Sequence, residues 1–202
     1  LSGMAHMTGY RGEGPMKSGI NHGDPITGSH AAGVLMAALR HRRTTGKGMF
    51  IDVSQQESSV ALMGPEVLAY QMTGREPERL GNRSSWYAPA NSYPCAGEDR
   101  WVTIAVTNND QWAGLARTMG APGMAEDPRF ATADKRQENQ DELDAVISEW
   151  TVGQEASEIT NQLQNARVPS GPVLRGPDLL EDRHYTDRGT FVTVDHPQVG
   201  PK

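Results

Sequence analysis

Cysteine is almost absent from this chain of 202 residues, since Cys95 is the single one. One thiol cannot form a disulfide framework or a cysteine metal site within the chain. The histidines show no close pairing of the kind that metal sites use, so we expect no metal. A reducing cytoplasm is the expected setting, and Cys95, with no adjacent base, is expected to be a buried or inert thiol.

A surplus of basic residues is also lacking. Lysine and arginine together number 19 against 25 acidic residues, which gives a formal net charge of −6. Nucleic acids and anionic membranes attract proteins with basic stripes, so neither is an expected partner. No apolar run is long enough to suggest a membrane span, and no signal peptide is visible.

Glycine and proline are abundant instead, at 22 and 13 residues. This composition is typical of a globular chain with many turns, and the length fits one large domain or two small ones. Leu1 stands where an initiator methionine would be, so we expect a piece of a longer protein. Residues 1–23 are glycine-rich and without periodicity, which predicts a loop.

The order changes at Asp24. Asp24 followed by Pro25 is typical of a helix start, with the aspartate as N-cap and the proline in the first helical position. Apolar residues then recur at helical spacing over 31–39, and arginines close the last turn. Residues 49–53 predict a short strand. A capping box over 54–57 opens a further helix, which Gly74 ends.

A second group of elements follows a loop-like stretch, 75–95, which is the candidate linker between domains. Residues 101–106 predict a strand, and Asn108 or Asn109 caps a helix that Gly120 ends. Amphipathic spacing predicts two more helices near 143–150 and 159–163, then a broken pattern at Pro169–Pro172. The segment 178–187 reads as helical at its start, and 191–194 as a last strand. Three tryptophans are expected on core faces: Trp101, Trp112 and Trp150.

Asp24 is the sharpest candidate for chemistry. A carboxylate at a helix N-terminus after a glycine loop is favoured in its ionised form, which is the form that acts as a nucleophile. Gly23 and Gly28 are expected to leave the approach to it open. His22 could assist proton movement there or be a solvated loop residue. A routine N-cap without chemistry is the alternative for Asp24.

Two weaker candidates involve phosphate groups. The glycines before Asp24 could cradle a phosphate, although no strand precedes them and the Walker pattern is missing. Arg43 and Lys47, with Arg40 and Arg42, form a basic cluster that could meet an acidic ligand such as a CoA phosphate. A solvated helix end explains this cluster equally well.

The chain resembles the family III CoA-transferases, the superfamily of formyl-CoA transferase, carnitine CoA-transferase and α-methylacyl-CoA racemase. The resemblance extends over essentially the whole chain and rests on the order and spacing of several short matches. They are Ser2-Gly3-Met4, Gly23-Asp24-Pro25, Arg43-Thr44-Thr45-Gly46-Lys47-Gly48, Ile51-Asp52-Val53-Ser54, Arg79-Leu80-Gly81-Asn82, Asp127-Pro128-Arg129-Phe130 and Val168-Pro169-Ser170-Gly171-Pro172.

The resemblance implies that Asp24 is the catalytic aspartate, which carries CoA from an acyl-CoA donor to a carboxylic acid acceptor through covalent intermediates. It implies no permanently bound cofactor, since the CoA thioester is a substrate. It also implies a homodimer of interlocked rings.

The implied fold is α/β with a smaller α+β domain. In that fold, residues 1–75 would end the first half of the large domain. Residues 76–170 would be the linker and the small domain, and 171–202 a segment returning toward the large domain. Most of the family's N-terminal Rossmann-like segment, which carries much of the CoA surface, has no counterpart in these residues.

Two other functions stay open at this point. An α-methylacyl-CoA racemase would use Asp24 as one acid/base group and an upstream histidine as the other. A non-catalytic piece would only fold or associate with a partner chain. The substrate acid is not readable from the residues.

Overall fold

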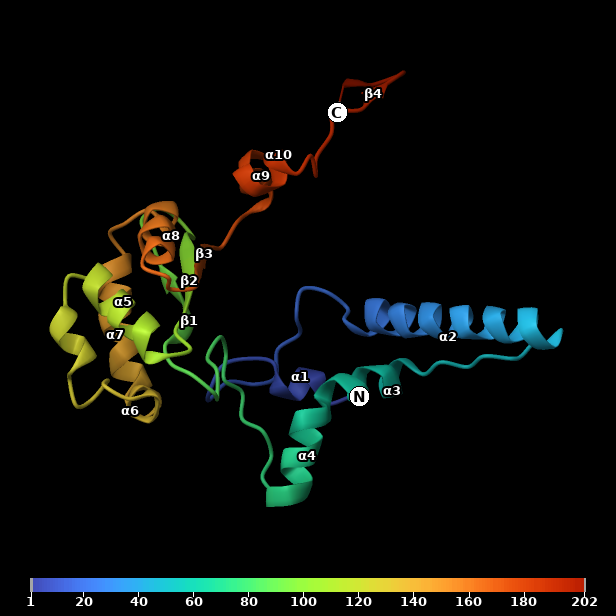
Figure 1. Ribbon diagram of the computed structural model, residues 1–202, viewed down its shortest axis with the longest axis horizontal. Helices are drawn as coiled ribbons and strands as arrows, with labels where there is room; N and C mark the ends of the chain where they lie inside the picture. The colour runs from blue at the N-terminus through green and yellow to red at the C-terminus, as the bar shows by residue number, and fades with distance from the viewer. Residues whose placement is uncertain (1, 202) are drawn as a thin grey trace. The chain divides into compact units, whose positions relative to one another are not determined.

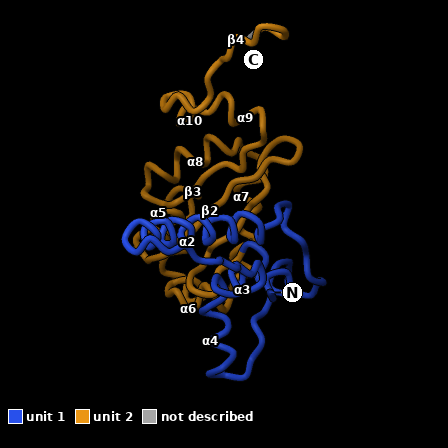
Figure 2. The backbone as a smooth tube through the Cα atoms, turned by 90° about the vertical axis from the view of Figure 1, so that its right-hand side faces the viewer, with its two compact units in different colours: residues 1–82 blue, residues 83–202 orange. Residues whose placement is uncertain are grey.

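The computed structural model describes residues 2–201 (Figure 1). It divides into two compact units, unit 1 over residues 1–82 and unit 2 over residues 83–202, which Figure 2 shows in separate colours. Within the described residues, no helix combines the length and the apolar character needed to cross a membrane.

Unit 1 is helical. It contains α1 (Met4–Met7), α2 (Gly23–Thr45), α3 (Gln55–Val60), the 3₁₀ turn η1 (Ala61–Met63) and α4 (Gly64–Thr73). The prediction of Asp24 as N-cap is wrong. His22 already has helical dihedral angles (φ −53°, ψ −31°), so α2 begins at Gly23 and Asp24 is its second residue. The Asp24 side chain therefore does not cap α2.

The predicted strand at 49–53 is also wrong. Residues 47–54 run without regular structure between α2 and α3, and no strand pairs with them among residues 2–201. A strand needs a partner to satisfy its backbone groups, which local sequence does not reveal. The serine half of the predicted capping box is confirmed, because the Ser54 side chain accepts a hydrogen bond from the Glu57 backbone N–H at 3.2 Å; the return bond from the Ser54 N–H to the Glu57 side chain does not form in the described residues. Gly74 ends α4 in the left-handed region, as predicted.

Helix α2 has no buried residue, although its apolar spacing is as predicted. Leu35 is 53% exposed, and Phe50 in the following segment is 91% exposed. The apolar side of this helix thus finds no core within unit 1.

Unit 2 is built on a small antiparallel sheet in the order β1 (Ala90–Pro94), β2 (Trp101–Ala105), β3 (Ser170–Pro172). Thr103 is paired with Ser92 on one side and with Gly171 on the other. Two predictions are corrected here. The loop-like stretch 75–95 contains β1, and the broken pattern at 169–172 contains β3. Both strands are short and contain residues that are depleted in strands, Asn and Pro in β1 and Gly and Pro in β3, so only β2 carries a readable strand pattern.

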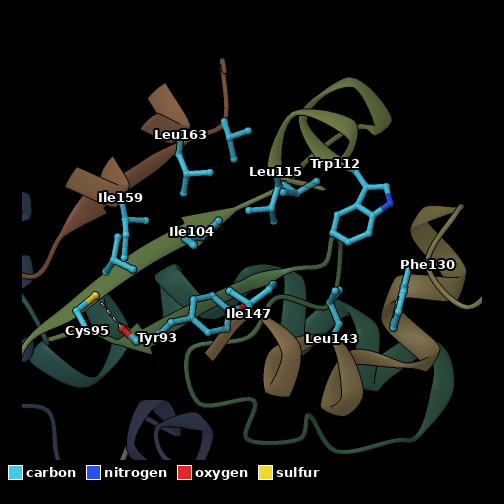
Figure 3. Close-up of a cluster of buried hydrophobic side chains, with 13 residues drawn as sticks. Tyr93, Cys95, Ile104, Trp112, Leu115, Phe130, Leu143, Ile147, Ile159 and Leu163 are labelled. Carbon is cyan, nitrogen blue, oxygen red and sulfur yellow. Dashed lines mark hydrogen bonds between the residues drawn. The ribbon is translucent and has the colours of Figure 1, made fainter. Parts of the chain in front are cut away.

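Helices cover this sheet and enclose a dry core. They are α5 (Asn109–Thr118), the 3₁₀ turn η2 (Pro122–Ala125), α6 (Ala133–Glu138), α7 (Gln140–Thr151) and α8 (Ala156–Asn165). The predicted cap is confirmed, with Asn108 accepting from the Gln111 N–H at 2.9 Å. Figure 3 shows side chains from sheet and helices meeting in the core, which contains Tyr93, Val102, Ile104, Trp112, Leu115, Phe130, Leu143, Ile147, Ile159 and Leu163.

Of the three tryptophans that were predicted to lie on core faces, two contact this core. Trp112 is buried and meets Phe130 edge-on, with ring centroids 6.1 Å apart. Trp150 is partly buried and packs against the cluster. Trp101 is 38% exposed, so its predicted core position is wrong. It occupies an outward position on β2, where successive side chains alternate between the two faces.

A buried polar cluster joins the beginning of unit 2 to α7. The Asp144 carboxylate accepts hydrogen bonds from Arg83 (2.9 Å), Asn91 (3.0 Å) and the Tyr93 hydroxyl (2.7 Å). Burial and the nearby Asp144 charge together raise the pKa of Tyr93. Cys95 is buried as expected, and burial raises the pKa of its thiol.

The chain ends in short elements: α9 (Gly176–Glu181), α10 (Arg183–Asp187), β4 (Asp195–His196) and β5 (Gly200–Pro201). Arg100 binds Asp178 of α9 with an N–O distance of 2.6 Å. The predicted strand at 191–194 is wrong, since pairing begins only at Asp195, where β5 supplies the antiparallel partner.

Candidate functional site

A pocket of about 540 Å³ opens beside the N-terminus of α2. Its lining includes Asp24 and His22 at the helix start, Lys17 from the preceding loop, and Gln55 and Ser59 from α3. Asp24, Lys17 and His22 are the ionisable groups among the lining residues. One carboxylate therefore faces a pocket that is also lined by the side chains of Lys17 and His22.

The position of Asp24 follows from the local chain. As the second residue of α2 it lies in the first turn, where unpaired backbone N–H groups favour negative charge. Its backbone N–H is itself satisfied by the Asn21 carbonyl at 3.2 Å. The exposed side chain is then free to interact with other elements.

Gln55 is the functional neighbour that sequence reasoning missed. Its side-chain Nε2 donates to Asp24 Oδ1 at 2.8 Å, across 31 residues of sequence. Neither the Ser54–Glu57 capping box nor helical spacing carries a signal for this contact. It exists because α3 lies against the start of α2, with Ser58 and Ser59 buried.

The packing of the protein itself does not require glycine beside Asp24. A Cβ atom on Gly23 would meet only Ser59 Oγ, at 3.9 Å, and one on Gly28 would meet nothing within 4 Å. The clearance that the two glycines would give an approaching substrate stays a prediction.

The other sequence candidates lie in different places. His22 lines the same pocket as Asp24. Arg43 and Lys47 lie exposed at and just beyond the opposite end of α2. Arg43 is nineteen positions after Asp24 in α2, which at a rise of 1.5 Å per residue is about 28 Å. A contact between these basic residues and CoA stays a prediction.

The glycine-rich loop before α2 is fixed by unit 1 itself. Arg79 donates to the His6 carbonyl at 2.9 Å and to the Glu13 carbonyl at 3.0 Å, and the Gly81 N–H donates to the Gly9 carbonyl at 2.9 Å. A Cβ atom on Gly81 would lie 2.6 Å from the ring of Tyr10, so glycine is required there. These contacts hold the loop in place, and parts of the loop line the pocket beside Asp24. Within residues 2–201, no group of three or more potential metal ligands gathers.

Comparisons with known proteins identify relatives of this chain. The family model described as CoA-transferase family III matches residues 1–201. A succinyl-CoA–D-citramalate CoA-transferase of Chloroflexus aurantiacus is 34% identical over 200 residues, which cover 99% of this chain and 50% of the relative. A succinyl-CoA:mesaconate CoA-transferase of Haloarcula marismortui is 32% identical, with 98% and 48% covered.

A solved structure is also similar to this chain. A CAIB/BAIF family protein from Brucella suis superimposes with a TM-score of 0.83 at 26% identity, covering 100% of this chain and 55% of that one. The chain thus spans about half the length of the relatives that it matches. Since the family model extends over nearly every residue, this chain belongs to CoA-transferase family III.

Proposed function

We propose that the protein transfers CoA from an acyl-CoA donor to a carboxylic acid acceptor through covalent adducts on Asp24. The observation that carries this proposal is the exposed Asp24 carboxylate at the mouth of a pocket, with one oxygen held by Gln55. The names of the two relatives support the reaction class, because both are succinyl-CoA-dependent CoA-transferases.

The first half of the reaction loads CoA onto the protein. An Asp24 oxygen attacks the thioester carbonyl of the donor, a C–O bond forms, the C–S bond breaks, and CoA leaves as a thiolate. The thiolate then attacks Cγ of Asp24 in the mixed anhydride, and the donor acid departs as a carboxylate. A covalent aspartyl-CoA thioester remains.

The second half of the reaction passes CoA from Asp24 to the acceptor acid. A carboxylate oxygen of the acceptor attacks Cγ, and the thiolate leaves again. The thiolate then attacks the acyl carbon of the acceptor in the second anhydride, which yields the new acyl-CoA and regenerates the Asp24 carboxylate. No proton or oxidant is consumed, so carboxylates and a thiolate suffice.

The charge of the pocket suits such substrates. Lys17 lines the pocket, and its charge is opposite to that of the acids that must enter. A cationic side chain in a partly enclosed pocket raises the local concentration of anions. CoA enters and leaves as a substrate, without a permanently bound cofactor. The interlocked homodimer and the cytoplasmic setting remain predictions from the family resemblance. The relatives named above give no support to the racemase alternative.

Substitution of Asp24 tests the proposal. In the full-length protein, Asp24→Ala and Asp24→Asn should lower kcat on the order of 10³-fold or more, as expected when a nucleophile is removed. Hydroxylamine should trap a hydroxamate at Asp24 in the wild-type protein with acyl-CoA present, and mass spectrometry should find none in the variants.

Asp110 provides a matched control, because it is likewise an exposed carboxylate at the second position of a helix, α5. Asp110→Asn should leave activity and trapping unchanged. Near-normal turnover by a folded Asp24→Asn protein would overturn the proposal, and would favour a non-catalytic role for this chain's carboxylate.

A further inference from the structure

The side chain of Gln55 is held where it meets Asp24. Gln55 is the first residue of α3, directly after the capping Ser54, whose side chain accepts the Glu57 N–H. Its own backbone carbonyl accepts a hydrogen bond from Ser59 Oγ at 2.8 Å, and Ser59 is buried. The backbone is therefore anchored at Ser54 and at Gln55 itself, while the Gln55 amide lines the pocket.

The contact with Asp24 distinguishes the two carboxylate oxygens. Gln55 Nε2 donates to Oδ1 at 2.8 Å, a distance typical of a strong hydrogen bond to an ionised acceptor. With Oδ1 held, the carboxylate cannot rotate freely, and Oδ2 is the oxygen presented for attack. Holding a nucleophile in one orientation removes much of the entropic barrier to reaction.

We propose that Gln55 is a hydrogen-bond donor to the reacting carboxylate, which orients Asp24 for attack through Oδ2 and then stabilises the negative charge that develops on Oδ1. This inference rests on the function proposed above, since it assigns a role within the Asp24 reaction.

The charge develops on Oδ1 in two steps. After attack through Oδ2, Oδ1 is the carbonyl oxygen of the anhydride. When the CoA thiolate attacks Cγ, a C–S bond forms and the carbonyl electron pair moves onto Oδ1. Collapse of this intermediate breaks the Cγ–Oδ2 bond and releases the donor carboxylate. When the acceptor carboxylate later attacks Cγ of the thioester, the pair moves onto Oδ1 again, and collapse expels the thiolate. An N–H already in place at Oδ1 stabilises both intermediates, as an oxyanion hole does.

An uncharged amide is well suited to this task. A lysine or arginine in the same place would neutralise the carboxylate in an ion pair and weaken it as a nucleophile. A glutamine donates one hydrogen bond without a net charge, so it can hold Oδ1 and leave Oδ2 reactive.

The test compares Gln55→Leu with Gln55→Glu in the full-length protein, beside Asp24→Asn. Gln55→Leu removes the donor and should lower kcat by about 10- to 100-fold, the loss expected for a hydrogen bond to a charged group. KM should change little, because the bond acts on the nucleophile. Gln55→Glu should be the slower variant, because an ionised glutamate cannot donate and repels Asp24. Single-turnover hydroxylamine trapping at Asp24 should slow in the same order.

A merely structural role gives the reverse order, because glutamate has the shape of glutamine and leucine does not. A Gln55→Glu protein as active as Gln55→Leu or more so would therefore overturn the inference. Gln162→Leu is the control, since Gln162 is an exposed glutamine on α8 in unit 2, and its kcat should match wild type. If the leucine variant does not fold, Gln55→Ala removes the donor without adding bulk.

The Asp24→Asn result separates the two proposals. If Asp24→Asn is inactive while Gln55→Leu turns over normally, the role of Gln55 is wrong and the proposed function stands. If Asp24→Asn turns over normally, the proposed function fails and the role of Gln55 fails with it.

Discussion

The two units of this chain are built in opposite ways. Unit 2 buries a contiguous hydrophobic cluster in which Leu143, Ile147 and Leu163 are inaccessible to solvent. Unit 1 carries Asp24, the proposed nucleophile, yet its longest helix, α2, buries no residue at all. One region is held by its own core, and the other by caps, turns and a few long-range hydrogen bonds.

Under the proposed function, the reactive group lies outside the best-packed part of the chain. Asp24 needs exposure on one side and a fixed hydrogen-bond donor on the other. Gln55 and the wall of the pocket supply these with few buried side chains. Stability and chemistry are thus assigned to different residues, so substitutions should separate the two.

The largest effect on stability is expected at Asp144 in unit 2. Asp144→Ala leaves the buried Tyr93 hydroxyl and the Asn91 amide without their acceptor and should lower the free energy of unfolding by about 3–5 kcal/mol. Asp141 is the control, because it also binds Arg83 (2.6 Å) but its side chain is 86% exposed. Asp141→Ala should cost at most about 1 kcal/mol in urea denaturation. Equal losses of unfolding free energy in the two variants would show that burial does not explain the contribution of Asp144 to stability.

A pair of leucines compares the two units directly. Leu143→Ala in the core of unit 2 should cost about 2–5 kcal/mol, because it removes buried methyl groups and leaves a cavity. Leu35→Ala on α2 should change the unfolding free energy by about 0.5 kcal/mol or less, since Leu35 already meets solvent. A large loss at Leu35 in the full-length protein would mean that α2 is covered there, and the contrast between the units would disappear.

The smallest expected effect is the acid sensitivity of α9. Hydrogen bonds from Arg100, and then from the Arg175 backbone, lower the pKa of Asp178 from its ordinary 3.8 to about 2. A carboxyl with a lowered pKa in the folded state stabilises that state above the ordinary value, and its contribution is lost as the pH falls from 3.8 toward 2. The protection of α9 against hydrogen exchange, measured relative to the intrinsic rate at each pH, should therefore fall in this window. Asp178→Asn should remove the pH dependence, and an unchanged pH profile in that variant would contradict the assignment.

Local signals in the sequence predicted several caps and helix ends, but they missed the short helix α1 in the stretch 1–23 and the division of the helix predicted over 54–74 into α3, η1 and α4. The caps at Ser54 and Asn108 and the end at Gly74 follow from contacts within four residues. Strands were harder to predict. The strand β2 is readable, but β1 and β3 exist only because they pair with it, and the apolar run at 49–53 has no such partner among the described residues.

The candidate site divides in the same way. Asp24 could be singled out from Gly23, Pro25 and the helix that follows, and from the family resemblance. Its exact position in the helix was wrong, because the conformation of His22 starts α2 early. Gln55 could not be found, since a contact across 31 residues depends on how α3 packs on α2.

The hydrogen bonds of Arg79 have a consequence for modularity. They join the residues just before unit 2 to His6 and Glu13, so the segment that leaves unit 1 is fastened to the loop that precedes α2. A graft between relatives therefore has to carry both segments, because either one alone would lose the hydrogen bonds of Arg79. Grafting residues 1–82 between relatives would move Asp24, Gln55 and the pocket wall together. It would also keep Arg79 with the loop to which it is hydrogen-bonded.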